Sequence, residues 1–74
     1  MRPEELKTLL TVTPFKPFSL HFTDGNTIMI THPDQVIVGT ESSVIGLNPN
    51  EQGFINGFAI CYMPHVVRVE RVTQ

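Results

Sequence analysis

Residues 18–31 read FSLHFTDGNTIMIT, and this stretch decides the fold. Apolar and polar residues alternate on both sides of a central Asp-Gly-Asn turn. The apolar positions are Phe18, Leu20, Phe22, Ile28 and Ile30. A period of two is typical of half-buried strands, and the turn residues lie between the two runs. The stretch therefore predicts a β-hairpin.

The length of the loop sets the register of this hairpin. A two-residue loop at Asp24 and Gly25 would divide the apolar residues between the two faces of the sheet. A three-residue loop over 23–25, with Gly25 at positive φ, keeps them on one face. The predicted pairs are Phe22 with Asn26, Leu20 with Ile28, and Phe18 with Ile30.

Upstream of the hairpin, residues 3–12 predict a short helix. Its first turn holds a proline and two glutamates, which suit the positive end of a helix dipole. Leu6, Leu9 and Leu10 form an apolar stripe. An isolated helix of three turns is not stable in water, so we expect the leucine stripe to cover an open end or face of the sheet. The alternative is a subunit interface.

The segment 13–18, TPFKPF, is expected to be stiff and extended, because each proline pushes the preceding residue away from helical geometry. We expect Phe15 and Phe18 to anchor it to the core.

Downstream of the hairpin, a His-Pro-Asp-Gln step turns the chain, and a polar loop occupies residues 48–53. Further strands are predicted over residues 36–39, 43–47, 54–62 and 66–72, with one 3₁₀ turn at 63–65. In the closing strand we expect Val67 and Val69 to face the core, and Arg68 and Glu70 to face solvent.

This order of elements predicts a mainly β fold, a small SH3-like or Sm-like barrel of about five short antiparallel strands with one N-terminal helix. Closing such a sheet removes most of its free edges. Neither an internal repeat nor a low-complexity tract is present, so we expect residues 1–74 to form a single domain.

The composition limits the classes of function. The single cysteine excludes a disulfide within one chain, and the formal net charge of −2 gives no overall attraction to nucleic acid or anionic membrane. Charged residues make up 16% of the chain, below the ~25% usual for folded domains. A sparsely charged surface favours self-association, so we expect a homo-oligomer.

The same features predict location. The first residues lack the apolar segment of a signal peptide, and no apolar run approaches the ~18 residues that span a bilayer. A lone cysteine fits a reducing compartment. We expect a cytoplasmic protein without a membrane partner.

Four motifs carry a resemblance that covers nearly the whole chain. They are PFKPF at 14–18, DGN at 24–26, HPD at 32–34 and VVRVE at 66–70. In this order, after a leading helix, the chain resembles a group of short, uncharacterised bacterial proteins, in which an arginine stands where this chain has Lys16. The resemblance implies a bacterial protein and brings no activity with it.

A looser resemblance concerns the bacterial Sm-like RNA chaperones, which share the order helix, hairpin, strands, short connector and strand. Those proteins form rings and bind RNA through a basic Tyr-Lys-His-like connector. Here the connector reads Tyr62-Met63-Pro64-His65, without the lysine. The resemblance implies an RNA-binding ring that uses Tyr62, His65 and Arg68.

Metal and thiol chemistry would depend on four residues: His21, His32, Cys61 and His65. Their spacing matches no common metal-binding pattern, so no metal and no cofactor are predicted. Cys61 and His65 are the candidates for a thiol- or metal-dependent enzyme, the third and least favoured hypothesis. Cys61 alternates with Ile60 and Tyr62, and is therefore expected to face outward or to pack at the edge of a neighbouring copy.

The segment 53–58, GFINGF, is the remaining candidate for function. Phe54 and Ile55 lie beside a polar loop, and exposed apolar groups next to a sheet edge mark an interface. Alternatively, both residues cover one end of the barrel. The predicted contact residues are Phe54, Ile55, Phe58, Tyr62, His65 and Arg68. The sequence thus favours a non-enzymatic, self-associating interaction module, with the RNA-binding ring as the alternative.

Overall fold

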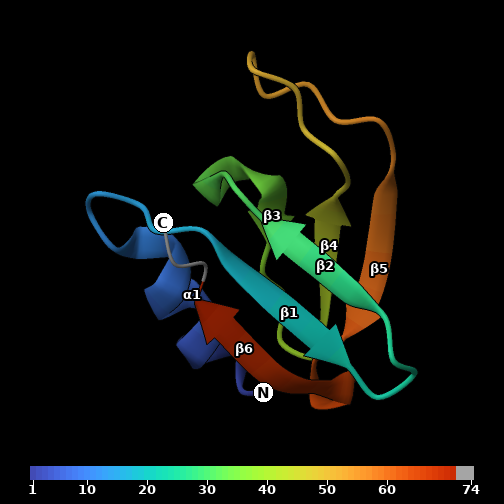
Figure 1. Cartoon of the computed structure of the whole chain (residues 1–74). Coiled ribbons are helices and arrows are strands. Elements are labelled where there is room, and N and C mark those ends of the chain that lie inside the picture. Colours follow the sequence, from blue (N-terminus) through green and yellow to red (C-terminus); the bar gives the residue numbers. More distant parts are fainter. Residues whose placement is uncertain (72–74) are drawn as a thin grey trace.

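One helix, six short strands and two single-turn 3₁₀ helices make up the fold in the computed structural model, which describes residues 1–71 (Figure 1). The elements are α1 (Pro3–Thr11), β1 (Phe18–Phe22), β2 (Thr27–Ile30), η1 (Pro33–Gln35), β3 (Val36–Ile37), β4 (Ser42–Gly46), β5 (Phe58–Tyr62), η2 (Met63–His65) and β6 (Val66–Arg71). The mainly β class is confirmed, with six strands in the described residues against the five or so predicted.

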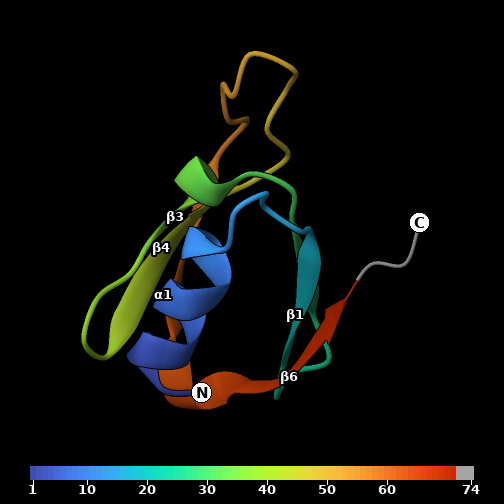
Figure 2. The ribbon, with the colours of Figure 1, turned by 90° about the vertical axis from the view of Figure 1, so that its left-hand side faces the viewer.

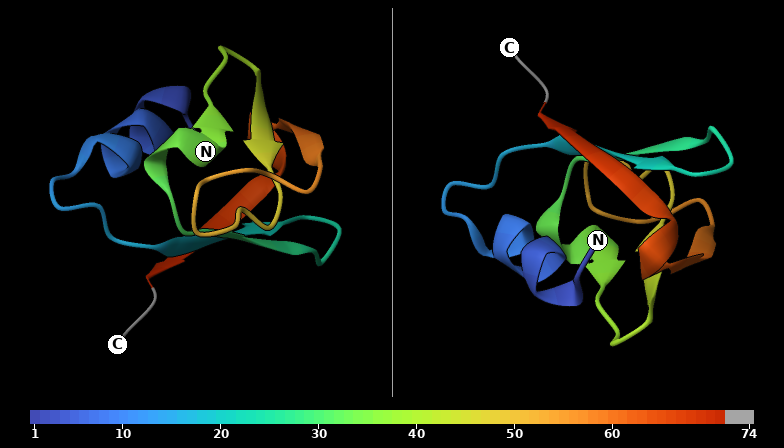
Figure 3. Two further views of the ribbon diagram at one scale, coloured as in Figure 1. Left: turned by 90° about the horizontal axis from the view of Figure 1, so that it is seen from above. Right: turned by 90° about the horizontal axis from the view of Figure 1, so that it is seen from below.

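The strands form two antiparallel sheets, in the orders β2–β1–β6 and β3–β4–β5. Figure 2 shows the sheets on either side of α1, and Figure 3 shows the helix at the opposite side of the molecule from the tip of the β1–β2 hairpin. The two sheets are not joined into a closed barrel. The molecule therefore has two inner faces that pack together and two outer faces.

The β1–β2 hairpin has the predicted register. Phe18 pairs with Ile30 and Leu20 with Ile28. The amide of Phe22 donates to the carbonyl of Asn26 at 2.9 Å, and Gly25 has a φ of +88°. These contacts confirm the three-residue loop, which places the apolar residues of both strands on one face.

The core lies between the inner faces and under α1. Its buried apolar members are Leu6, Leu10, Phe18, Leu20, Ile30, Val36, Ile45, Met63 and Val66. The helix contributes Leu6 and Leu10, while Leu9 is partly buried against the same cluster. The expectation that the leucine stripe covers an open side of the sheets is confirmed. Phe15 also packs on the core, with its ring centroid 6.0 Å from that of Phe18.

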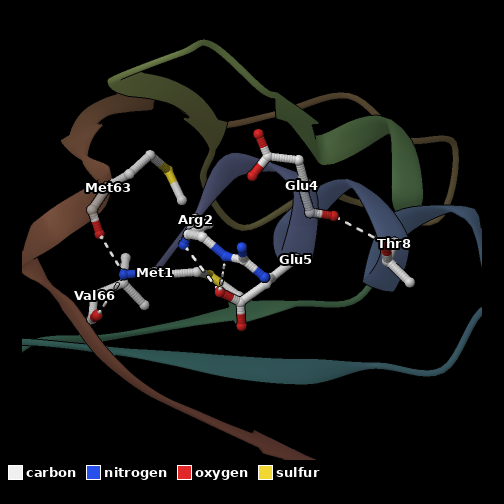
Figure 4. A network of polar contacts seen from close by, with 7 residues as sticks. All are labelled: Met1, Arg2, Glu4, Glu5, Thr8, Met63 and Val66. Atoms are coloured by element: carbon white, nitrogen blue, oxygen red, sulfur yellow. Dashed lines mark hydrogen bonds and ion pairs between the residues drawn. The ribbon is translucent and has the colours of Figure 1, made fainter.

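The turn η2 carries the chain from one sheet to the other, and hydrogen bonds hold it on several sides. The His65 carbonyl accepts a hydrogen bond from the Thr23 amide at 2.8 Å. The amino group of Met1 donates to the carbonyls of Met63 at 3.3 Å and Val66 at 3.4 Å (Figure 4). The start of α1 is thereby attached to the turn between β5 and β6.

Gln35 joins the two sheets from inside. Its side chain is buried, and its amide nitrogen donates to the carbonyls of Met29 at 3.0 Å and Gly46 at 2.8 Å. Its amide oxygen accepts from the Thr31 backbone at 3.0 Å. One side chain thus satisfies backbone groups in both sheets, a role that the sequence did not reveal.

Val67 does not face the core, contrary to the prediction. Along β6, Arg68 pairs with His21 but Val66 pairs with Phe22, so Val67 is the extra residue of a β-bulge. The bulge directs Val66 inward and leaves Val67 62% exposed. Val69 is half-buried, and Arg68 and Glu70 face solvent as predicted.

Two predicted strands are shorter in the structure. The strand expected over 36–39 ends at Ile37, and the one expected over 54–62 begins at Phe58. Residues 48–57 form a protruding loop instead, closed by hydrogen bonds between Leu47 and the backbones of Asn56 and Gly57 at 2.9 and 2.8 Å. Position 72, predicted to end the last strand, lies outside the described residues.

Candidate functional site

The outer face of the β3–β4–β5 sheet carries a row of three β-branched residues. Ile37 on β3 is directly opposite Val44 on β4, which is directly opposite Ile60 on β5. Ile37 and Ile60 are each 70% exposed, and Val44 is half-buried between them. The row runs across the whole width of the sheet.

Aromatic residues extend this row along β5 in both directions. Phe58 pairs with Gly46 and is 64% exposed, and Tyr62 pairs with Ser42 and is 46% exposed. Since side chains alternate along a strand, both rings point to the same side as Ile60. Not one residue of β3, β4 or β5 is charged.

Ile55 completes the surface at the end near the protruding loop. Gly46 has no side chain, and a Cβ built on it would lie 2.5 Å from Cγ2 of Ile55. The Ile55 side chain therefore lies over Gly46 on the outer side of β4. We call Ile37, Val44, Ile55, Phe58, Ile60 and Tyr62 the apolar face. Phe54 lies in the protruding loop and is 73% exposed.

The outer face of the β2–β1–β6 sheet is mostly polar and charged, although Met29 on it is 45% exposed. His21 lies in its centre, with Nδ1 at 3.2 Å from Thr27 Oγ1 and 3.4 Å from an Arg68 guanidinium nitrogen. The shielded Nε2 of His21 lies 3.3 Å from a Glu70 carboxylate oxygen, without the alignment of a hydrogen bond. A polar outer face is usual for an antiparallel sheet with one side in water. The apolar face departs from that pattern.

The predicted contact residues divide between these surfaces. Phe58, Tyr62 and Ile55 belong to the apolar face, and His65 touches Tyr62, with ring centroids 5.1 Å apart in an edge-to-face arrangement. Arg68 lies on the other sheet, where it contacts His21 and Glu70. The structure thus separates Arg68 from the Tyr62–His65 pair.

A cleft of about 480 Å³ opens between the tip of the β1–β2 hairpin and β5. Its lining includes Phe22, Ile28, Ala59, Cys61, Tyr62 and His65. Cys61 is half-buried and packs against the core, so the expectation that it faces outward is wrong, whereas packing at the edge of a neighbouring copy stays a prediction. The pairing of Ser43 with Cys61 explains this, because Ser43 is an inward-facing, buried residue of β4.

The environment of Cys61 does not activate its thiol. Burial raises the pKa of Cys61, and the carboxylate of Asp24 raises it further. Nucleophilic cysteines have a lowered pKa, produced by a nearby cation or a helix N-terminus. The contacts of Cys61 therefore favour a thiol that stays protonated at neutral pH.

Metal-ligating residues do not converge within the described chain. No group of three or more His, Cys, Asp or Glu side chains could hold a metal ion among residues 1–71. Nor does that part of the chain contain a helix with the length and hydropathy to cross a membrane.

Three members of the apolar face were not identified from the sequence: Ile37, Val44 and Ile60. One signal was present, since β3 and β5 read VI and FAICY without a polar, outward-facing position. A half-solvated strand alternates apolar and polar residues, and an uninterrupted apolar run indicates a strand covered on both faces.

No family model matches the chain, and no curated protein or solved structure matches it either.

Proposed function

We propose that this protein is a non-enzymatic interaction module that associates with itself through the apolar face. One observation carries the proposal: of two sheets in the same small molecule, one has a mostly polar and charged outer face and the other an uncharged, apolar one. Exposed contiguous apolar surface of this kind marks interaction sites in folded proteins.

The energetic reason is the hydrophobic effect. Fully burying a side chain the size of isoleucine or phenylalanine contributes roughly 1.5–3 kcal/mol. Ile37, Phe58 and Ile60 are each more than 60% exposed, so most of that contribution is still to be gained. Burying these side chains in an interface would therefore stabilise an oligomer relative to the isolated chain.

The architecture supports a binding role by analogy. The helix, the hairpin, the bent path through η1 and the η2 connector between sheets follow the order of SH3-like and Sm-like small barrels. We propose that the fold belongs to this type in an open form. Such folds host many functions, so the analogy adds only to the plausibility of an interaction module.

An Sm-like RNA-binding ring is the second candidate, and the contact between Tyr62 and His65 favours it. An aromatic side chain in this connector offers a surface on which a base can stack. Against it, Arg68 lies in the β2–β1–β6 sheet and contacts His21 there, so the cation that would bind phosphate faces away from the ring pair. Titration of a fluorescent single-stranded RNA with wild type and with Tyr62→Ala decides between the two. An RNA-binding ring would bind the RNA as wild type and bind it more weakly as Tyr62→Ala, whereas an interaction module of the proposed kind would bind it in neither form.

Molar mass measured by light scattering tests the proposed self-association. The chain has a mass of 8.3 kDa, so a dimer is readily distinguished from a monomer. We expect the mass to rise with concentration, and to rise at least as much at high salt, because burial of uncharged apolar surface is not screened by ions. A mass of one chain at all concentrations would refute self-association.

A further inference from the structure

We infer that the occupant of the apolar face is a second copy of this chain, packed face to face about a two-fold axis that passes beside Val44. This inference rests on the proposed self-association and specifies its geometry. It differs from a ring, in which the free edges of strands would pair and the apolar face would stay exposed.

The apolar face is large enough to form the centre of such a dimer interface, though not the whole of it. Five of its side chains are between 46 and 70% exposed, namely Ile37, Ile55, Phe58, Ile60 and Tyr62. At roughly 150–200 Å² for each large apolar side chain, the exposed parts amount to about 500 Å², and about 650 Å² with Phe54. A standard interface buries about 800 Å² from each partner, with a polar rim around an apolar centre.

The absence of charge favours an identical copy over a foreign partner. In a two-fold symmetric interface each residue near the axis meets its own copy, so any charge there would face a like charge. The strands that carry the apolar face contain no charged residue. The other sheet has Arg68 and Glu70 on its outer side, so packing it against its copy would require these charges to lose water and to find opposite charges across the axis.

The shape of the surface also suits pairing of sheets. Two sheets pack about 10 Å apart when their facing side chains interdigitate. Val44 lies on the central strand, with Ile37 on one side and Ile60 on the other. An axis beside Val44 therefore brings Val44 next to its copy and buries both isoleucines, whether the facing strands run parallel or antiparallel.

Site-directed cross-linking tests this geometry. In a Cys61→Ser background, Val44→Cys and Val67→Cys each leave one cysteine, and a short bismaleimide is the probe. We expect Val44→Cys to give mostly cross-linked dimer and Val67→Cys to give little, although Val67 is 62% exposed on β6. Equal yields, or a higher yield for Val67→Cys, would overturn the inference.

Charge substitutions give an independent readout and separate this inference from the proposed function. Ile60→Lys and, as a second variant, Ile37→Lys should each weaken self-association at least tenfold in sedimentation equilibrium. Val67→Lys, a change of similar exposure on the other sheet, should leave it unchanged. Self-association that persists in both isoleucine variants would refute the apolar face as the contact surface and the face-to-face dimer with it. A monomeric wild type would refute self-association itself, and self-association that is lost in these variants without a cross-link at Val44→Cys would refute the two-fold geometry alone.

Discussion

The side chain of Ile55 occupies the space that Gly46 leaves open on the outer side of β4. A Cβ at Gly46 would lie 2.5 Å from Cγ2 of Ile55 and 3.4 Å from the carbonyl oxygen of Gln35. This contact connects the protruding loop 48–57 to the sheet and places an isoleucine next to Phe58. The glycine is thus required by packing, not by an unusual backbone conformation.

Gly46→Ala should destabilise the fold by about 1–3 kcal/mol, because the added methyl group overlaps Cγ2 of Ile55, whose side chain must then leave its place on the sheet. Urea unfolding measures the change. Gly57→Ala is the matched control, since a Cβ there meets no atom within 4 Å. Adding Ile55→Ala to Gly46→Ala should recover part of the loss, and equal stabilities for the Gly46 and Gly57 variants would contradict the packing explanation.

Gln35→Ala should cost about 2–4 kcal/mol, because three backbone groups lose their partner and one of them, the carbonyl of Gly46, is buried. Gln35→Glu separates donor from acceptor, since a carboxylate accepts from the Thr31 amide but donates nothing to the carbonyls of Met29 and Gly46. Both variants should therefore be destabilised in urea. Gln52→Ala, in the exposed loop, serves as control, and a Gln35→Ala variant as stable as that control would show that the buried amide is dispensable.

Alkylation of Cys61 by iodoacetamide should be slower in the folded protein than in the same chain unfolded in urea, at every pH below about 9. The raised pKa, due to burial and then to Asp24, lowers the fraction of reactive thiolate. By linkage, the stability that this group contributes is present at neutral pH and is lost as the pH rises through the folded-state pKa. Equal rates in the two states would contradict the half-buried, inward position.

Acid should weaken the hairpin through Asp24. The backbone N–H of Asn26, and then its side-chain amide, hold the pKa of Asp24 below its usual value, each at 2.9 Å. The carboxylate form is therefore favoured by folding, and its contribution is lost as the pH falls through the lowered pKa. Asp24→Asn keeps an acceptor but does not titrate, so its stability should depend less on pH between about 5 and 2 than that of wild type. Parallel pH curves would count against this role.

The hairpin could be predicted because two local signals agree there. Alternation in residues 18–22 and 27–30 selects the face, and Gly25 at a φ of +88° selects the loop. The helix could be predicted equally well, because its leucine residues lie on one face and only that face can be buried. In both cases the information lies within about a dozen neighbouring residues.

The orientation of β5 and β6 could not be obtained in the same way. In β5 both alternating sets are apolar, so the pattern does not say whether Cys61 or Tyr62 faces the core. In β6 a bulge opposite β1 moves Val67 outward, and a bulge is set by the partner strand. These outcomes depend on tertiary pairing, which a local pattern does not contain.

The candidate site was found in part for the same reason. Phe54 and Ile55 stood out because they lie beside a polar loop, and Phe58 because it ends the same segment. Ile37 and Ile60 resemble ordinary core residues in the sequence, and only the register through Val44 brings them into one exposed row. An uncharged run with no polar positions is therefore as consistent with an interface as with a core.

The most direct test of the apolar face as the contact surface is a dilution series of isoleucine methyl NMR spectra of the wild-type protein. Of the six isoleucines, Ile37, Ile55 and Ile60 lie on the apolar face, Ile30 and Ile45 are buried, and Ile28 is half-buried on β2. We predict that the three outer methyl signals shift together with one dissociation constant, while the two buried ones stay in place. Outer signals that do not change up to millimolar concentration, in a protein that scatters light as a monomer, would contradict the proposed self-association.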